Sequence, residues 1–130
     1  MENKNIKVLV VDDEVDFRRL MTFWLQSKGY SVLVASDGNS AIQIVKEEKP
    51  DVVFMDLKMP VMDGVEAIKR IRQFDKKLPI IIISAHLDDP KENETLPYGI
   101  SGIFYKGKDF DTEGLPLLES VLRTHKQLKK

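Results

Sequence analysis

Short apolar runs alternate with amphipathic stretches along the whole chain. The runs lie at residues 7–11, 31–35, 52–55, 80–83 and 103–105. Apolar runs of this length, bounded by turn-forming residues, are typical of parallel strands buried on both faces. The run at 31–35 alternates less cleanly and is expected at an edge. The pattern therefore predicts an α/β domain in which five strands form an open parallel sheet with right-handed helical crossovers.

The stretches between the runs carry helical periodicity. The first, which Gly29 is expected to end, places a stripe of large apolar residues on one helix face. The second opens at 37–40, and in the third Asp63 and Glu66 form a capping pattern. The positions expected to be buried are Phe17, Leu20, Met21, Trp24, Leu25, Ala41, Ile42, Val45, Val65, Ile68, Ile71, Leu118, Val121 and Leu122.

Residues 87–98 depart from this regularity. They carry Pro90, Pro97 and mixed charges, with little apolar periodicity. Proline inside a helix costs about 3 kcal/mol or more, so the fourth helix is expected to be irregular or shortened, between the two prolines. The final helix should begin near 114–116, with lysines at 126, 129 and 130 suited to its negative C-terminal end.

Polar side chains follow four of the predicted strands. Asp12 and Asp13 come after the first strand, Asp56 after the third, Ser84 after the fourth and Lys106 after the fifth. In open parallel sheets, ligands bind beyond the carboxyl ends of the strands. If these strands are neighbours, three carboxylates, one hydroxyl and one ammonium meet in a small volume.

Such a cluster favours chemistry on a phosphoryl group. Two carboxylates about 4 Å apart repel by roughly 4 kcal/mol at an effective dielectric near 20. Mg²⁺ relieves this conflict, since it prefers a few carboxylates, waters and phosphate oxygens. A carboxylate beside the metal can then attack phosphorus and give an aspartyl phosphate. Lys106 supplies a positive charge for a phosphoryl oxygen and Ser84 a short hydroxyl donor.

Each residue also has a simpler interpretation. Asp12 and Asp13 could cap the first helix, and Asp56 could be a turn residue. Ser84 could bond to nearby backbone, and Lys106 could be solvated. The combination of the required groups at all four strand ends favours a site. The two histidines, His86 at the rim and His125 near the last helix end, are not expected to be catalytic.

Composition narrows the class of protein. The chain has 130 residues, a net charge of −1 and no cysteine. This length suits a single domain, expected to span 1–130, and the near-balanced charge argues against bulk affinity for nucleic acid or a membrane. Disulfides and thiolate metal sites are excluded. The polar start is unlike a signal peptide, and a cytoplasmic protein is predicted.

The motifs VLVVDDE, VVFMDLKMPVMDG, IIIISA and FYK, in this order and spacing, resemble the receiver (CheY-like) domain of two-component response regulators. The resemblance implies a flavodoxin-like (βα)5 doubly wound sheet in the order 2-1-3-4-5. It implies that Asp56 is the phosphoacceptor, that Asp12, Asp13, Asp56 and the Lys58 carbonyl bind Mg²⁺, and that Ser84 and Lys106 contact the phosphoryl group.

The resemblance also implies partners. The phosphodonor would be a sensor histidine kinase or a histidine phosphotransfer protein, and the phosphorylated domain would signal to a downstream effector or output domain. The chain's own catalysis would be limited to its phosphorylation and dephosphorylation, rather than that of a metabolic enzyme. Homodimerisation is compatible with the family, and the sequence identifies neither the kinase nor the effector.

Three features depart from the family pattern. Ile103 stands where an aromatic switch residue is usual, Gly107 stands where a proline usually follows the lysine, and the segment between Pro90 and Pro97 replaces a regular fourth helix. Two other classes share parts of this pattern: a receiver-like module that is not phosphorylated, and an Mg²⁺-dependent phosphatase with an aspartyl intermediate. The phosphatase typically needs an acid two residues beyond the nucleophile, where this chain has Lys58. A nucleotide-binding module fits less well, because no glycine-rich phosphate loop follows a strand.

Overall fold

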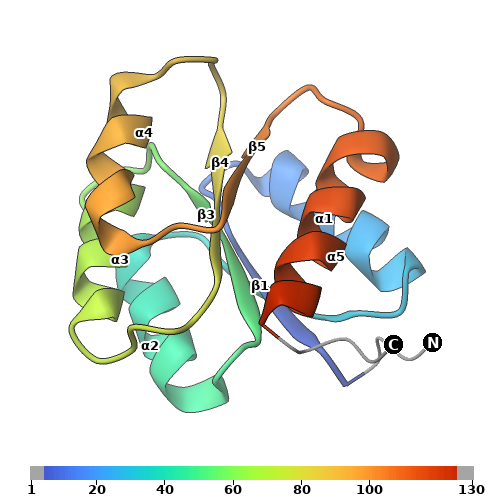
Figure 1. The fold of residues 1–130 in the computed structure, drawn as a ribbon, viewed down its shortest axis with the longest axis horizontal. Coiled ribbons are helices and arrows are strands. Elements are labelled where there is room, and N and C mark those ends of the chain that lie inside the picture. The colour runs from blue at the N-terminus through green and yellow to red at the C-terminus, as the bar shows by residue number, and fades with distance from the viewer. Residues whose placement is uncertain (1–4, 126–130) are drawn as a thin grey trace.

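A computed structural model describes residues 5–125 and shows one parallel sheet (Figure 1). Its strands lie in the order β2-β1-β3-β4-β5, which confirms both the expected order and the edge position of 31–35. The strand ends are those predicted from the apolar runs, to within one residue. The bounds are β1 Lys7–Val11, β2 Ser31–Ala35, β3 Val52–Asp56, β4 Ile80–Ser84 and β5 Gly102–Tyr105.

Helices cover both faces of the sheet. In Figure 1, α2, α3 and α4 lie on one side and α1 and α5 on the other. The bounds are α1 Val15–Ser27, α2 Gly38–Glu48, α3 Gly64–Arg72, α4 Pro90–Thr95 and α5 Leu115–Thr124. The predicted short fourth helix is confirmed, since α4 starts at the first proline and a 3₁₀ turn, Leu96–Tyr98, follows it. A π-helical segment, Phe110–Gly114, which the sequence did not predict, leads into α5.

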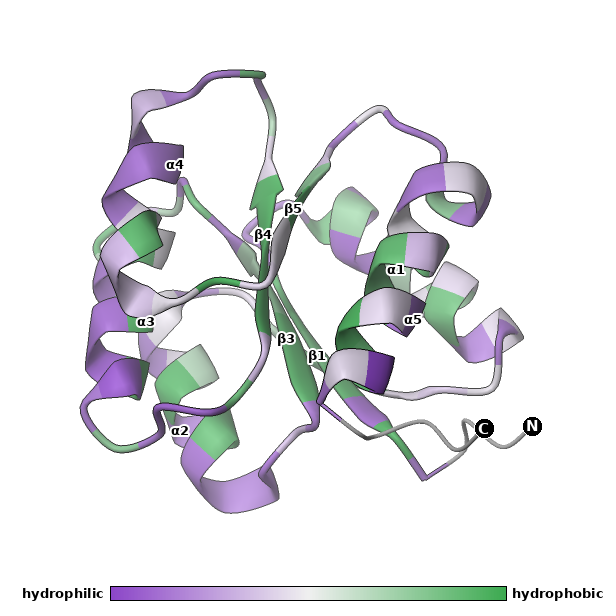
Figure 2. Ribbon diagram, viewed as in Figure 1, coloured by the Kyte–Doolittle hydropathy of each residue, from purple (hydrophilic) through white to green (hydrophobic). Residues whose placement is uncertain are grey.

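The sheet separates two apolar layers. Alternate residues of β1 point to opposite faces, so Leu9 packs towards α2 and α3, while Val10 packs towards α1 and α5. All the side chains of β3 and β4 are buried. Figure 2 shows the strands as the most hydrophobic part of the chain, with hydrophilic residues on the outer faces of the helices. This two-sided burial explains the continuous apolar runs.

Aromatic rings join α1 to the segment before α5. The Trp24 and Phe110 rings stack with centroids 5.2 Å apart, and Phe104 of β5 meets Phe110 edge-on at 6.2 Å. Gly114 lies against these rings: a Cβ there would fall 2.6 Å from Phe110 Cδ1. The tight packing accounts for a glycine at this position.

Several sequence expectations need correction. The helical periodicity predicts Leu20 in the buried stripe of α1, but Leu20 is 43% exposed. The stripe that faces the core is narrower and centres on Met21 and Leu25. Asp63 caps α3 by accepting a hydrogen bond from the Glu66 amide, whereas the Glu66 side chain pairs with Arg70 and not with the cap. The lysines at 126, 129 and 130 lie outside the described residues.

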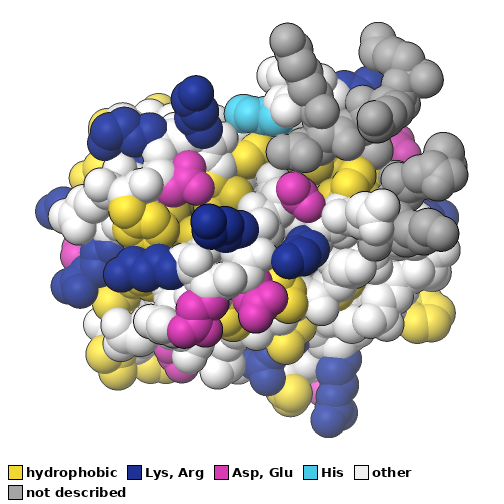
Figure 3. All heavy atoms as spheres, turned by 90° about the horizontal axis from the view of Figure 1, so that it is seen from below, with side chains coloured by type: hydrophobic (Ala, Val, Ile, Leu, Met, Phe, Trp, Pro, Cys, Tyr) yellow, Lys and Arg dark blue, Asp and Glu magenta, His cyan; other side chains and the backbone are white. Residues whose placement is uncertain are grey.

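The face where the strands begin carries charges of both signs. Figure 3 shows Lys and Arg side chains interspersed with Asp and Glu on this side of the molecule. No helix among residues 5–125 combines the length and apolarity needed to cross a bilayer.

Gly64 allows the start of α3 to lie against the end of β3. A Cβ at Gly64 would lie 2.1 Å from the Asp56 carbonyl oxygen, and the Gly64 amide donates a hydrogen bond to the Leu57 carbonyl at 2.9 Å. This close approach sets the shape of the loop that follows Asp56.

Substitution of Gly64→Ala is expected to lower the free energy of unfolding by about 2–3 kcal/mol, because the new methyl group meets backbone that cannot move aside. Gly38→Ala is a matched control, since Gly38 is likewise the first residue of a helix, but its Cβ would meet the flexible Met62 side chain. Urea unfolding measures both. A loss at Gly64 no larger than that at Gly38 would contradict the prediction.

Candidate functional site

The pairing of the strands brings the predicted polar residues to one edge of the sheet. Val11 of β1 lies beside Met55 of β3, so Asp12 and Asp56 are neighbours at the strand ends. The Lys106 amide donates a hydrogen bond to the Ser84 carbonyl at 2.9 Å, which places the end of β5 against that of β4. One oxygen each from Asp12, Asp13 and Asp56 lies within 4.8 Å of the others.

Burial makes this cluster electrostatically costly. Asp12 is fully buried and Asp56 is 5% exposed, whereas Asp13 is exposed. Burial, followed by repulsion from Asp12, raises the pKa of Asp56 from 3.8 to about 7, although Lys106 acts in the opposite direction. Burial also raises the pKa of Asp12, which the Glu14 amide and Lys106 partly offset. The two carboxylates therefore resist simultaneous ionisation even with the Lys106 ammonium beside them.

Lys106 is the cation in contact with this cluster. Its Nζ lies 2.9 Å from Asp12 Oδ2 and 3.9 Å from Asp56 Oδ2, and it also forms an ion pair with Glu14. Burial alone would lower the pKa of Lys106, but the close contacts of its ammonium with the Glu14 and Asp12 carboxylates outweigh burial and raise that pKa. The ammonium therefore stays charged at neutral pH.

The carboxylates fit a hard divalent cation. Lys106 Nζ lies near Asp12 Oδ2, but this buried oxygen accepts no hydrogen bond of good geometry. A buried oxygen without a hydrogen bond, close to two further carboxylates, matches the oxygen-donor set that Mg²⁺ prefers. The Lys58 amide lies 3.3 Å from Asp56 Oδ1, so the start of the loop carrying the predicted carbonyl ligand bends towards the cluster.

Ser84 lies at the same edge but is turned to the backbone. It is 1% exposed, and its Oγ donates a hydrogen bond to the His86 carbonyl at 2.9 Å. In this structure, the Ser84 hydroxyl therefore makes the hydrogen bond to nearby backbone that was the simpler interpretation of the sequence. A rotation about χ1 is the change that would redirect the hydroxyl.

Neither Asp12 nor Asp13 caps α1. Glu14 occupies the N-cap position, and its side chain makes no capping hydrogen bond. Asp12 Oδ1 instead accepts a hydrogen bond from the Glu14 amide at 2.8 Å. This contact orients the carboxylate and leaves the other oxygen directed at Lys106.

Two ion pairs connect α4 to the loop after Asp56. Lys58 Nζ lies 3.0 Å from Asp89 Oδ2, and Lys91 Nζ lies 2.7 Å from Asp63 Oδ2. The sequence did not predict these pairs, because the irregular 87–98 segment gave no indication of which residues it faces. The Tyr105 hydroxyl also donates a hydrogen bond to Glu92 Oε1 at 3.2 Å.

The departures from the family pattern have local explanations. Gly107 has φ +89°, a conformation that proline, with φ near −65°, cannot adopt. Ile103 is partly buried and packs against the apolar layer beneath α2 and α3. Tyr105, two residues beyond position 103, connects β5 to α4 through the hydrogen bond from its hydroxyl to Glu92.

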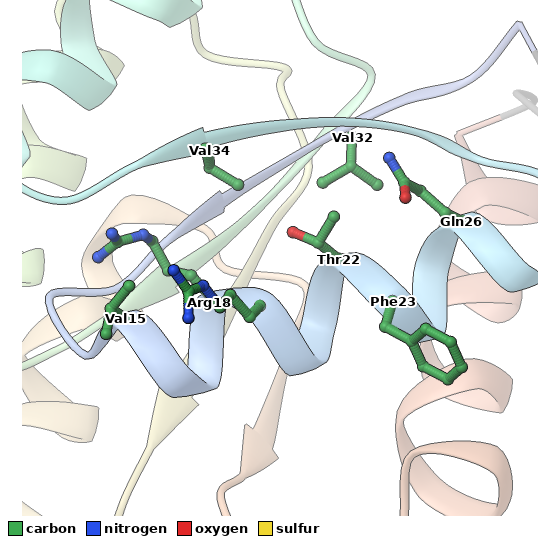
Figure 4. A pocket seen from close by; sticks show the side chains of 8 residues that line it. Val15, Arg18, Thr22, Phe23, Gln26, Val32 and Val34 are labelled. Carbon is green, nitrogen blue, oxygen red and sulfur yellow. The ribbon is translucent and has the colours of Figure 1, made fainter.

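A surface groove lies on the side of the molecule that carries the edge strand. It has a volume of about 540 Å³ and runs between α1 and the edge strand β2. Figure 4 shows Arg18, Thr22 and Gln26 of α1 facing Val32 and Val34. Among the described residues that line it, none belongs to the carboxylate cluster, although Arg18 Nη1 donates a hydrogen bond to the Asp12 carbonyl at 2.8 Å.

Comparison with known proteins agrees with this geometry. The response regulator receiver domain model matches residues 8–116. Sporulation initiation phosphotransferase F of Bacillus subtilis is 36% identical over 107 residues, covering 82% of this chain and 86% of that protein. The transcriptional regulatory protein ZraR of Klebsiella oxytoca is 32% identical over 124 residues, which are 95% of this chain. The aligned part is only 28% of ZraR's length.

Solved structures show the same fold. The chemotaxis protein CheY4 of Vibrio cholerae superposes with a TM-score of 0.84 at 34% identity, covering 90% of this chain and 98% of that one. A LuxR-family two-component response regulator from Aurantimonas sp. SI85-9A1 gives a TM-score of 0.83 at 30% identity, and the match covers 91% of this chain and 85% of that one. The carboxylate cluster at the edge of a five-stranded 2-1-3-4-5 sheet thus belongs to a response regulator receiver domain, and the chain is a member of that family.

Proposed function

We propose that Asp56 accepts a phosphoryl group in an Mg²⁺-dependent reaction. The observation that carries this proposal is the position of Asp56: it is buried beside Asp12 and Asp13, with the Lys106 ammonium 3.9 Å away. A carboxylate held among further carboxylates and one ammonium suits in-line transfer, in which the protein's main task is positioning and charge stabilisation.

In the proposed reaction, an Asp56 oxygen forms a bond to phosphorus while the bond from phosphorus to the donor breaks. For a phosphohistidine donor, the electron pair of the P–N bond returns to the imidazole nitrogen. Asp56 must be ionised to attack, which its raised pKa opposes in the absence of a metal ion. Lys106 is close enough to bind a phosphoryl oxygen after a small side-chain movement.

The metal would be held by Asp12, Asp13, Asp56 and the Lys58 carbonyl. When bound, Mg²⁺ neutralises the negative charge of the carboxylates and of the transferring group. The fold orients Asp12 and Asp56, because the Glu14 amide donates a hydrogen bond to Asp12 Oδ1 and the Lys58 amide donates one to Asp56 Oδ1. Asp13 is exposed and is the side chain with most freedom to adjust.

Phosphorylation would shift the loops after β4 and β5. A phosphoryl group adds about −1.5 to −2 charges, which would attract Lys106 and the Ser84 hydroxyl. The Ser84 hydroxyl would then release the carbonyl of His86, which lies at the start of the segment that leads to α4. We propose that residues 87–98 are the element that moves, since α4 has one buried residue, Thr95.

The phosphodonor is proposed to be a sensor histidine kinase or a histidine phosphotransfer protein, and the receiver to act on an effector. The chain, proposed to form one domain, is a signalling module rather than a metabolic enzyme. The phosphatase alternative is disfavoured, because phosphatases of that class typically have an acid two residues beyond the nucleophile. This chain has Lys58 there, and Lys58 pairs with Asp89.

Incubation with a small acyl phosphate and Mg²⁺ should add the mass of one phosphoryl group, because Asp56 would then be ionised beside the metal. Intact-mass measurement checks this. Asp56→Ala and a sample without Mg²⁺ are expected to remain unmodified. An equal adduct on the Asp56→Ala chain would assign the acceptor elsewhere.

Without metal, Asp56→Asn is expected to stabilise the fold at neutral pH. Since the pKa of Asp56 is about 7 in the folded chain and 3.8 ordinarily, the native chain loses stability as pH rises from about 4 to about 7. The free energy of unfolding of the variant should exceed that of the native chain by an amount that grows over this range, reaches about 1–3 kcal/mol and then levels off. Urea unfolding with a chelator measures it, and an advantage independent of pH would refute this prediction.

Amide hydrogen exchange should change across residues 86–107 when a beryllium fluoride phosphoryl mimic is bound, because Ser84 lies just before this stretch and Lys106 lies near its end. Helix α2, on the far side of α3 from α4, serves as the internal reference. Equal protection across 86–107 with and without the mimic would exclude this segment as the moving element.

A further inference from the structure

Lys106 is contacted by two residues outside the carboxylate trio. Its Nζ forms an ion pair with Glu14, and it lies 4.8 Å from the centre of the Phe17 ring. The Glu14 side chain is 62% exposed, whereas that of Lys106 is 17% exposed. The ammonium is therefore held between two buried acids and one carboxylate at the rim of the site.

Glu14 is free to make this contact. It occupies the N-cap position of α1, where a short side chain usually accepts a hydrogen bond from the helix, yet it makes none. Its backbone amide is fixed by Asp12 Oδ1 at 2.8 Å. The side chain thus starts from a fixed point beside the cluster and extends towards the end of β5.

Lys106 can change partners without any movement of the backbone. Its amide is bound to the Ser84 carbonyl, so its ammonium moves by rotation of the four-carbon side chain. A cation among the carboxylates would repel this ammonium and compete for Asp12 Oδ2. Glu14 would then be the carboxylate that remains paired with Lys106. An incoming phosphoryl oxygen would have to compete with Glu14 for the Lys106 ammonium.

We propose that Glu14 is a positioning residue that holds Lys106 at the rim of the site in the unphosphorylated protein, so that Lys106 must leave Glu14 to bind a phosphoryl oxygen. This inference rests on the proposed phosphoacceptor function of Asp56. The pair is weak because solvent screens it, which lets a phosphoryl group carrying about −1.5 to −2 charges displace it.

The test measures initial rates of Asp56 phosphorylation by a small acyl phosphate at saturating Mg²⁺, with intact mass as the readout. Glu14→Gln should lower the donor concentration for half-maximal rate by about two- to fivefold, the range of an exposed ion pair, and leave the maximal rate unchanged. Glu14→Asp, which keeps the charge, should return towards the native value. In a Lys106→Met background, Glu14→Gln should have no effect.

Asp16→Asn is the control for loss of charge. Asp16 also lies in the first turn of α1, and it is not among the carboxylates that Lys106 contacts. An equal gain from Asp16→Asn, or a gain from Glu14→Gln that persists without Lys106, would show a general charge effect and overturn the proposal.

A second readout needs neither metal nor phosphorylation. Unfolding constants are measured in the presence of a chelator for four chains: the native chain, Glu14→Gln, Lys106→Met and the double variant. Together these four constants form a double-mutant cycle. Coupling of about two- to fivefold in the unfolding constant is expected, and its absence would overturn the proposal. If no chain forms an adduct on Asp56, the proposed function fails, and this cycle alone decides whether Glu14 holds Lys106.

Discussion

Repulsion between buried carboxylates is the constraint on which the structure of this edge depends. Asp12 follows β1 and Asp56 ends β3, two adjacent strands whose apolar side chains are buried between two helical layers. The carboxylates cannot separate without disturbing the sheet, so their charge has to be balanced from outside it. Lys106 supplies one positive charge, and the remaining imbalance is what makes the site receptive to a divalent cation.

The fold followed closely from the sequence, for a physical reason. Strands buried on both faces need continuous apolar runs, and these are hard to confuse with amphipathic helices, so the strand bounds agree to within a residue. The strand order came from the resemblance to receiver domains and not from periodicity. The gathering of Asp12, Asp56, Ser84 and Lys106 at one edge was also predictable, because all parallel strands end on the same side.

The contacts among long, exposed side chains were not predictable. Glu14 directly follows the acidic pair after β1, so its position near the site could be predicted from the sequence. Which carboxylate Lys106 contacts depends on side-chain geometry, which the sequence does not give. The pairs Lys58–Asp89 and Lys91–Asp63 depend on the position of α4, which has too few buried apolar residues to show its orientation in the sequence. The exposure of Leu20 shows a further limit, since periodicity marks a stripe but not its width.

The stacking of Trp24 on Phe110 bears on how this protein can be observed. Trp24 is the single tryptophan of the chain, and it lies in the layer of α1 and α5, with the whole sheet between it and α4. Its emission therefore monitors the packing of that layer and global unfolding. Rearrangement of α4 would be nearly silent in intrinsic fluorescence, and a spectroscopist following it would need a dye placed on α4 itself.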